Sequence, residues 1–189
     1  NNPGESVYDI AGNFAFTGGT GFYLDKTAPM ISASVSTQPN AAGWYSHNPT
    51  VYYTCNDSVS GIVNNACPSP QQFSQEGAAV SSAALTVTDN AGNSSQPSNV
   101  FTFKIDKTAP VLSATMPPAQ VFLNASHNFN LGATDALSGI ASQGCGAINT
   151  STLGTRSVTC TATDRAGNSV SRSATYRVVY DFVPLSAPL

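Results

Sequence analysis

The chain has 189 residues, of which only 9% are charged, and its formal net charge is −3. Its seven basic residues are scattered, which argues against nucleic acid as a partner, because phosphate binding needs clustered Lys and Arg. No run of 18 apolar residues occurs, so we expect no membrane span in this segment, and the N-terminal stretch does not have the pattern of a signal peptide.

Internal repetition organises the chain. The stretch Asp25-Lys26-Thr27-Ala28-Pro29 returns unchanged at residues 106–110. Two further motifs recur in the same order relative to it: Asp-x-x-Ser-Gly-Ile at 57–62 and 135–140, and Asp-x-Ala-Gly-Asn at 9–13, 89–93 and 164–168. Repetition of this kind indicates tandem structural units.

The repeat predicts the domain boundaries. We expect residues 1–25 to be the C-terminal hairpin of an incomplete repeat, with whole domains at 26–106 and 107–183 and a tail or linker at 184–189. Domains this small have marginal cores and often gain covalent cross-links.

Short strands are predicted along the first whole repeat. Before it, residues 6–8 and 14–24 indicate two strands joined as a hairpin. Apolar residues after Pro29 predict a strand at 30–35, and strict alternation predicts another at 51–55. Further strands are expected around 83–88 and 100–105, joined by the turn at Asp89.

The second repeat follows the same order. Strands are expected around 111–112, 129–131, 158–162 and 176–178. Apolar spacing of three and four is not sustained anywhere, so no helix is predicted. About seven short strands in about 80 residues indicate an antiparallel, immunoglobulin-like β-sandwich.

The motifs also resemble a known family. The junction at 25–29, the turn at 57–62 and the run at 154–168 are similar to bacterial immunoglobulin-like tandem repeats, including those related to the hyalin repeat. This resemblance covers nearly the whole chain. It implies an extracellular or cell-surface protein in which such domains serve as stalks, spacers, adhesive modules or appendages of secreted enzymes.

Four cysteines, two in each whole repeat, indicate disulfides formed in an oxidising compartment. Their spacing does not match a zinc site. One pair in each repeat predicts the bridges Cys55–Cys67 and Cys145–Cys160. Cys67 and Cys145 occupy the same repeat position while their partners do not, so we expect this shared position to lie near two strands, as in the core of a two-sheet sandwich.

Six aspartates are expected to converge in threes at the domain junctions. They are Asp25, Asp57 and Asp89 in one group, and Asp106, Asp135 and Asp164 in the other. Three carboxylates at one place repel one another unless a cation or N–H donors compensate, and Ca²⁺ prefers such oxygen ligands. The alternative is that each aspartate caps its own turn through backbone N–H groups. Apart from Ca²⁺ no cofactor is expected.

Residues suited to catalysis are sparse. The only two histidines, His47 and His127, lie in loops, and no paired carboxylates or phosphate-binding loop suggest an enzyme. Trp44 and Tyr45 stand in a loop where a sugar-binding platform could form, although packing in the core is the alternative.

These observations predict a non-catalytic extracellular structural or adhesive module, as part of a stalk or a surface filament. The alternative is an accessory carbohydrate-binding domain of a secreted enzyme. Its partners would be neighbouring repeats, copies of itself, or a surface glycan or protein. The hairpin in residues 1–25 either completes an upstream domain of a longer chain or pairs with the sheet edge of a neighbouring subunit.

Overall fold

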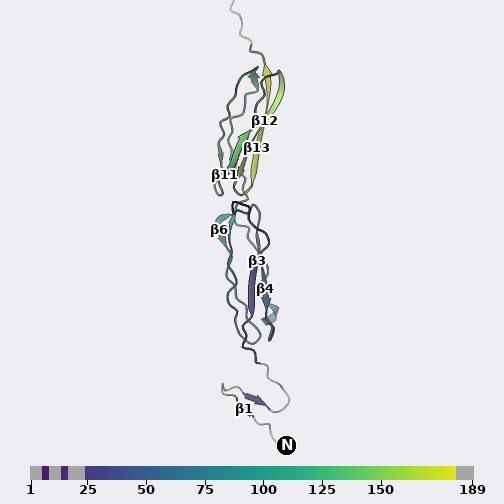
Figure 1. Ribbon diagram of the computed structural model, residues 1–189, viewed down its shortest axis with the longest axis vertical. Helices are drawn as coiled ribbons and strands as arrows, with labels where there is room; N and C mark the ends of the chain where they lie inside the picture. The colour runs from purple at the N-terminus through teal and green to yellow at the C-terminus, as the bar shows by residue number, and fades with distance from the viewer. Residues whose placement is uncertain (1–5, 9–13, 17–23, 182–189) are drawn as a thin grey trace, which may run out of the picture. The chain divides into compact units, whose positions relative to one another are not determined.

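The computed structural model describes residues 6–8, 14–16 and 24–181. Within these residues the chain is all-β, and its strands β1 to β13 are accompanied by a single 3-10 turn, η1 (Val63–Asn65) (Figure 1). Most strand pairs are antiparallel, which confirms the all-β class predicted from the sequence. No helix among these residues is long and apolar enough to cross a membrane.

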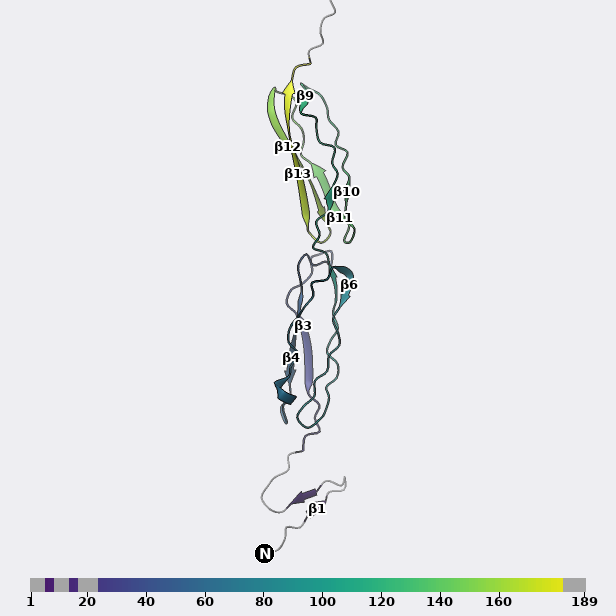
Figure 2. The ribbon, with the colours of Figure 1, turned by 180° about the vertical axis from the view of Figure 1, so that it is seen from behind.

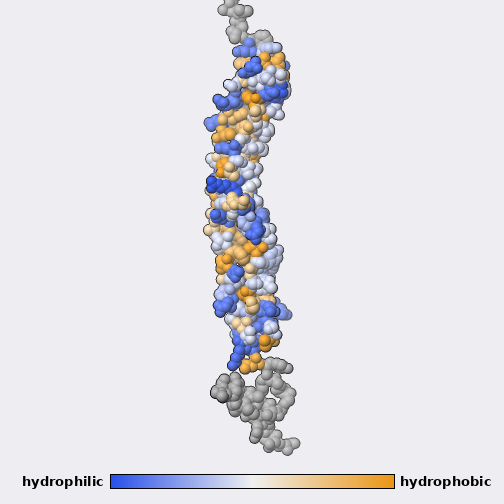
Figure 3. Space-filling model, viewed as in Figure 1, coloured by the Kyte–Doolittle hydropathy of each residue, from blue (hydrophilic) through white to orange (hydrophobic). Residues whose placement is uncertain are grey.

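The chain forms two compact units. The first comprises Asn1–Ser34, Tyr52–Pro70 and Ala83–Val100, and the second comprises Val35–Val51, Gln71–Ser82 and Phe101–Leu189. On the face drawn in Figure 3, hydrophilic and apolar residues are interleaved. A surface with so few charges depends for its polarity on hydroxyl and amide groups.

The N-terminal hairpin pairs as the sequence predicts. Strand β1 (Ser6–Tyr8) lies antiparallel to β2 (Phe14–Phe16), with Ser6 opposite Phe16. The intervening turn at 9–13, with Asp9, lies outside the described residues, as do residues 17–23. These two strands form a sheet of their own.

The next sheet has the order β3-β4-β5. It contains β3 (Met30–Val35), β4 (Thr50–Asn56) and the short β5 (Gln71–Gln72). Figures 1 and 2 both show β3 and β4 side by side. The alternating burial of β3 and β4 confirms the period-two pattern in their sequences.

The expected strand at 83–88 is not a regular strand. Serine side chains replace part of the backbone ladder, because the Ser98 hydroxyl accepts the N–H of Leu85 and the Ser95 hydroxyl accepts the N–H of Val87. Thr88 forms an isolated bridge with Ser94, and backbone bonds also run from Ser95 to Val87 and from Ser98 to Leu85. Pro97 lies between them and has no N–H to donate, so a continuous ladder cannot form there.

Four strands form the main sheet of the second unit, in the order β11-β12-β13-β9. The long hairpin of β12 (Gly154–Asp164) and β13 (Ser169–Val179) is flanked by β11 (Ile140–Cys145) and β9 (Gln120–Phe122). Strand β9 pairs parallel to β13, unlike the antiparallel pairs expected throughout. The sequence analysis missed β9 and β11, because neither has a sustained alternation of apolar residues.

The same unit contains two smaller sheets. Strand β6 (Gly77–Ser81) pairs with β7 (Thr102–Ile105), and β8 (Val111–Leu112) pairs with β10 (Ala133–Thr134). No strand forms at residues 129–131, where one was expected, and the backbone there contributes single bonds such as Thr115 N–H to the carbonyl of Asn130.

Apolar side chains of β9, β12 and β13 pack into one core. Val121, Val158, Tyr176 and Val178 are each at least 93% buried, and Phe129 packs against them. The hydroxyl of Tyr176 accepts the N–H of Asn149 at 2.9 Å, so the polar end of this ring has a partner. The core thus fixes β12 and β13, the two strands that flank the turn at Asp164.

Candidate functional site

The first group of aspartates converges as the sequence predicts. Carboxylate oxygens of Asp25, Asp57 and Asp89 lie within 4.8 Å of one another. Asp25 precedes β3, Asp57 follows β4, and Asp89 begins the turn at 89–93. Asp89 is fully buried. We call these three residues the first aspartate cluster.

The second group repeats this geometry in the second unit. Oxygens of Asp106, Asp135 and Asp164 also lie within 4.8 Å of one another. Asp106 and Asp164 are at most 1% exposed, while Asp135 is partly buried. We call these three residues the second aspartate cluster. The convergence of both groups therefore follows from the repeated motifs.

The middle aspartate of each cluster caps its own turn. Oδ1 of Asp57 accepts the N–H groups of Val59, Ser60 and Gly61, the last at 2.7 Å. Gly61 has a φ of 77°, which directs its N–H into the turn and which a residue with a side chain rarely adopts. The cap predicted for this motif is therefore confirmed at Asp57.

Asp135 makes the matching cap in the second unit. Its Oδ1 accepts the N–H of Leu137 at 3.1 Å and that of Gly139 at 2.7 Å, and the φ of Gly139 is 76°. The two turns thus share the bonds from the second and fourth residues after the aspartate, and they share the glycine conformation.

The aspartate at each junction joins the start of its repeat to this turn. Asp25 accepts the N–H of Thr27 with Oδ1 and that of Ser60 with Oδ2. In the second unit Asp106 accepts the N–H of Thr108 with Oδ1 and that of Ser138 with Oδ2. One carboxylate therefore links two segments that are 32 residues apart in the chain.

An asparagine ties the third turn to the same place. Oδ1 of Asp89 accepts the N–H of Asn93, and the Asn93 side-chain amide donates to Oδ2 of Asp89 and to the carbonyls of Asp25 and Thr27. The last residue of the Asp-x-Ala-Gly-Asn motif therefore acts as a clamp. The sequence analysis treated this motif only as a turn and missed the role of its asparagine.

Asn168 makes the same contacts in the second unit. Its amide donates to Oδ2 of Asp164 and to the carbonyls of Asp106 and Thr108, at distances between 2.8 and 3.3 Å. The clamp is therefore present in both copies of the motif that the structure describes.

Hydrogen bonds lower the pKa of two of these carboxylates. Hydrogen bonds from Ser60 and Thr27 hold the pKa of Asp25 below its ordinary value. Burial raises the pKa of Asp135, but the N–H groups of Gly139 and Leu137 outweigh it, so that its pKa is also lowered. Both side chains are therefore negatively charged near neutral pH.

The oxygen atoms left for a metal ion are few. Among the described residues, N–H groups donate to every carboxylate oxygen of the first aspartate cluster except Oδ2 of Asp57, and to every one of the second except Oδ2 of Asp135. Ca²⁺ takes six to eight oxygen ligands. The clusters have oxygen ligands of the type that Ca²⁺ prefers. The hydrogen bonds from the turns, however, already stabilise the negative charges of these carboxylates.

Beside the second aspartate cluster, Glu76 binds the residues that begin the second repeat. Its carboxylate accepts the N–H of Lys107 and the hydroxyl of Thr108, and the Lys107 ammonium donates to Asn48 Oδ1 and the Ser74 carbonyl. Among residues 24–181, no hydrogen bond holds the N–H or ammonium of Lys26, the equivalent of Lys107. No motif in the sequence marks Glu76.

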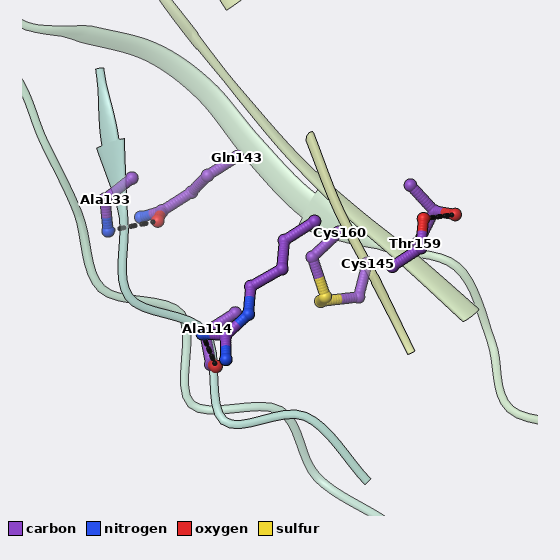
Figure 4. The surroundings of a disulfide bond; sticks show 8 residues. Ala114, Ala133, Gln143, Cys145, Thr159 and Cys160 are labelled. Atoms are coloured by element: carbon purple, nitrogen blue, oxygen red, sulfur yellow. Dashed lines mark hydrogen bonds between the residues drawn. A yellow bond between two sulfur atoms is a disulfide. The ribbon is translucent and has the colours of Figure 1, made fainter. Parts of the chain in front are cut away.

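Both predicted disulfides are present. Cys55 bonds to Cys67, and Cys145 bonds to Cys160. Cys145 lies directly opposite Cys160 on the adjacent strands β11 and β12 (Figure 4), so this bridge lies within one sheet rather than between two sheets. Two disulfides are consistent with an oxidising, extracellular environment.

Trp44 and Tyr45 belong to the interior. Trp44 is 8% exposed and Tyr45 is 6% exposed, and the Tyr45 ring packs edge-on against Phe103. A sugar could not stack on either ring unless the surrounding residues rearranged. Trp44 and Tyr45 therefore pack in the core, which was the alternative to a sugar-binding platform. His47 lies beside Tyr45, and His127 lies beside Phe129.

Comparisons with protein-family models, curated proteins and solved structures find no match.

Proposed function

We propose that this chain is a non-catalytic extracellular structural module, built from tandem immunoglobulin-like repeats, that forms part of a stalk or a surface filament. The observation that supports this proposal most is the duplicated aspartate cluster with its asparagine clamp. Equivalent hydrogen bonds hold the Asp-Lys-Thr-Ala-Pro stretch to the later turns in both copies. These polar contacts therefore serve to hold distant segments of the chain together.

The surroundings of the clusters agree with a mechanical role. Asp25 and Asp106 precede the first strand of each repeat, where a pulling force would enter the domain. A force applied there must break several charge-assisted hydrogen bonds together, and such bonds are stronger than neutral ones. Each disulfide also limits how far its repeat can extend.

The accessory carbohydrate-binding alternative has less support, because it depended on Trp44 and Tyr45, whose rings are buried. Its ligand would need another surface. A glycan array probed with the whole chain tests it directly, and binding that is lost in a Trp44→Ala variant that remains folded would favour the accessory domain over the structural module.

Single-molecule extension of the whole chain tests the structural proposal. We expect two separate unfolding events, each releasing roughly 3.5 Å for every residue outside the disulfide loop. The Asn168→Ala variant should lower the force of one event only. Smooth extension without force peaks in the unmodified chain would contradict a mechanical role.

A further inference from the structure

Strand β3 forms an open edge of its sheet. It pairs with β4 on one side, and among the described residues no strand pairs with its other side. Its sequence, Met-Ile-Ser-Ala-Ser-Val, has no proline and no charged residue, the features that natural proteins use to prevent further pairing at an edge. Its side chains alternate between exposed and half-buried.

The other sheet edges are less suited to pairing. Strand β11 has an irregular register between Ile140 and Ser142, and the Gln143 side chain accepts the N–H of Ala133 at 3.1 Å (Figure 4). The irregular register and the bound Gln143 side chain both hinder the addition of another strand to β11. Strands β5 and β9 are only two and three residues long. Among the outermost strands of the two larger sheets, β3 is therefore the longest without such an irregularity.

The hairpin of β1 and β2 supplies a matching donor. These strands form a two-stranded sheet, and no third strand joins it among the described residues. A two-stranded hairpin alone is marginally stable in water, whereas addition to a sheet edge satisfies its outer N–H and carbonyl groups. Its paired residues, Ser6–Tyr8 and Phe14–Phe16, carry no charge that would oppose pairing with β3.

We propose that the β1–β2 hairpin of one chain adds to the β3 edge of a second copy. This inference rests on the proposed function, since it names the partner through which the structural module assembles. The hairpin does not pair with β3 of its own chain in the structure. Each copy donates one surface and offers a different one, so the contact is heterologous and extends into a linear polymer unless it closes into a ring.

Cross-linking between two variants of the whole chain tests the contact. All four native cysteines are in disulfides, so Ala15→Cys in β2 and Ser32→Cys in β3 would each add a single free thiol. When an isotope-labelled Ala15→Cys chain is mixed with Ser32→Cys, we expect mixed disulfide dimers on mild oxidation. Thr161→Cys is the matched control, because Thr161 is exposed on β12, which is paired on both sides.

Sedimentation of the unmodified chain and of an edge variant gives an independent readout. We expect association that depends on concentration and that is weakened about tenfold or more by Ser32→Lys, which places a charge on the edge strand. Thr161→Lys should leave it unchanged. A strictly monomeric chain, or association indifferent to Ser32→Lys, would overturn the proposal. Two force-resistant unfolding events in the same material would show that the structural role stands without this contact.

Discussion

The side-chain amide of Asn168 donates to the carbonyl of Asp106, 62 residues earlier in the chain. The equivalent bond joins Asn93 to Asp25 across 68 residues. Each asparagine thus connects its Asp-x-Ala-Gly-Asn turn to the Asp-Lys-Thr-Ala-Pro stretch that precedes it in the chain. Long-range bonds of this kind order segments that local sequence preferences leave independent.

Replacing Asn168 by alanine should lower the free energy of unfolding by about 1–3 kcal/mol, because carbonyls of Asp106 and Thr108 lose a donor. Asn93→Ala should cost a similar amount. Urea unfolding measures both, with Asn56→Ala, at an exposed position at the end of β4, as the control. If the loss in free energy of unfolding is no larger than that of the control, water satisfies the freed carbonyls and the asparagine bonds add no stability.

The turn at Asp135 should make stability depend on pH in acid. Because the folded state lowers the pKa of Asp135, the group stabilises the fold above its ordinary value of 3.8, and this contribution is lost as the pH falls through the lower, folded pKa. We expect Asp135→Asn to be less stable at neutral pH and to lose less stability on acidification. Urea unfolding at a series of acidic pH values measures this. Parallel curves for the two proteins would contradict it.

Ca²⁺ should leave the thermal unfolding midpoint unchanged, because N–H donors already occupy nearly all the carboxylate oxygens of both aspartate clusters. Calorimetry with saturating Ca²⁺ and with a chelator is the measurement. A higher midpoint in Ca²⁺ that disappears in the Asp57→Asn, Asp135→Asn double variant would instead establish cation binding at the clusters.

The two Lys-Thr-Ala-Pro stretches should differ in their sensitivity to trypsin. Their local sequences are identical, but Glu76 and Ser74 bind only the second one. We expect cleavage after Lys26 to be faster than cleavage after Lys107, and Glu76→Ala to bring the two rates closer. Peptide mapping over time provides both rates from one sample. Equal rates in the unmodified chain would show that these bonds do not order the junction.

Each disulfide should contribute about 2–3 kcal/mol to stability, since the bridges close loops of 12 and 15 residues. Replacing Cys145 and Cys160 together by serine should lower the free energy of unfolding measured in urea by that amount, and the Cys55, Cys67 double variant should do the same. Peptide mapping without reductant checks the pairing. A peptide that joins cysteines of different repeats would contradict it.

Much of this arrangement could be predicted because it follows from repetition. Asp25, Asp57 and Asp89 recur at matching places in the second repeat, and a motif that returns intact must occupy an equivalent position. Gly61 and Gly139 similarly mark positions with positive φ. The all-β class follows from period-two alternation, which is strong in β4 and β12.

Features made by single side chains could not be predicted in this way. Nothing in the local sequence shows that Ser95 and Ser98 bond to the backbone of another segment, or that Glu76 reaches Lys107 31 residues later. Strand β11 was missed because Ala141-Ser142-Gln143-Gly144 has no apolar alternation, and it is held in place by pairing with β12. A strand that forms mainly because it pairs with a distant segment cannot be identified from the strand propensity of its own residues.

The duplicated clamp has an evolutionary consequence. Asp106, Asp135, Asp164 and Asn168 all lie within residues 106–168, so a segment that begins at the Asp106 junction carries a complete capping set. A gene segment that encodes one such repeat can be copied or deleted by recombination without separating any residue from its hydrogen-bond partner in the set.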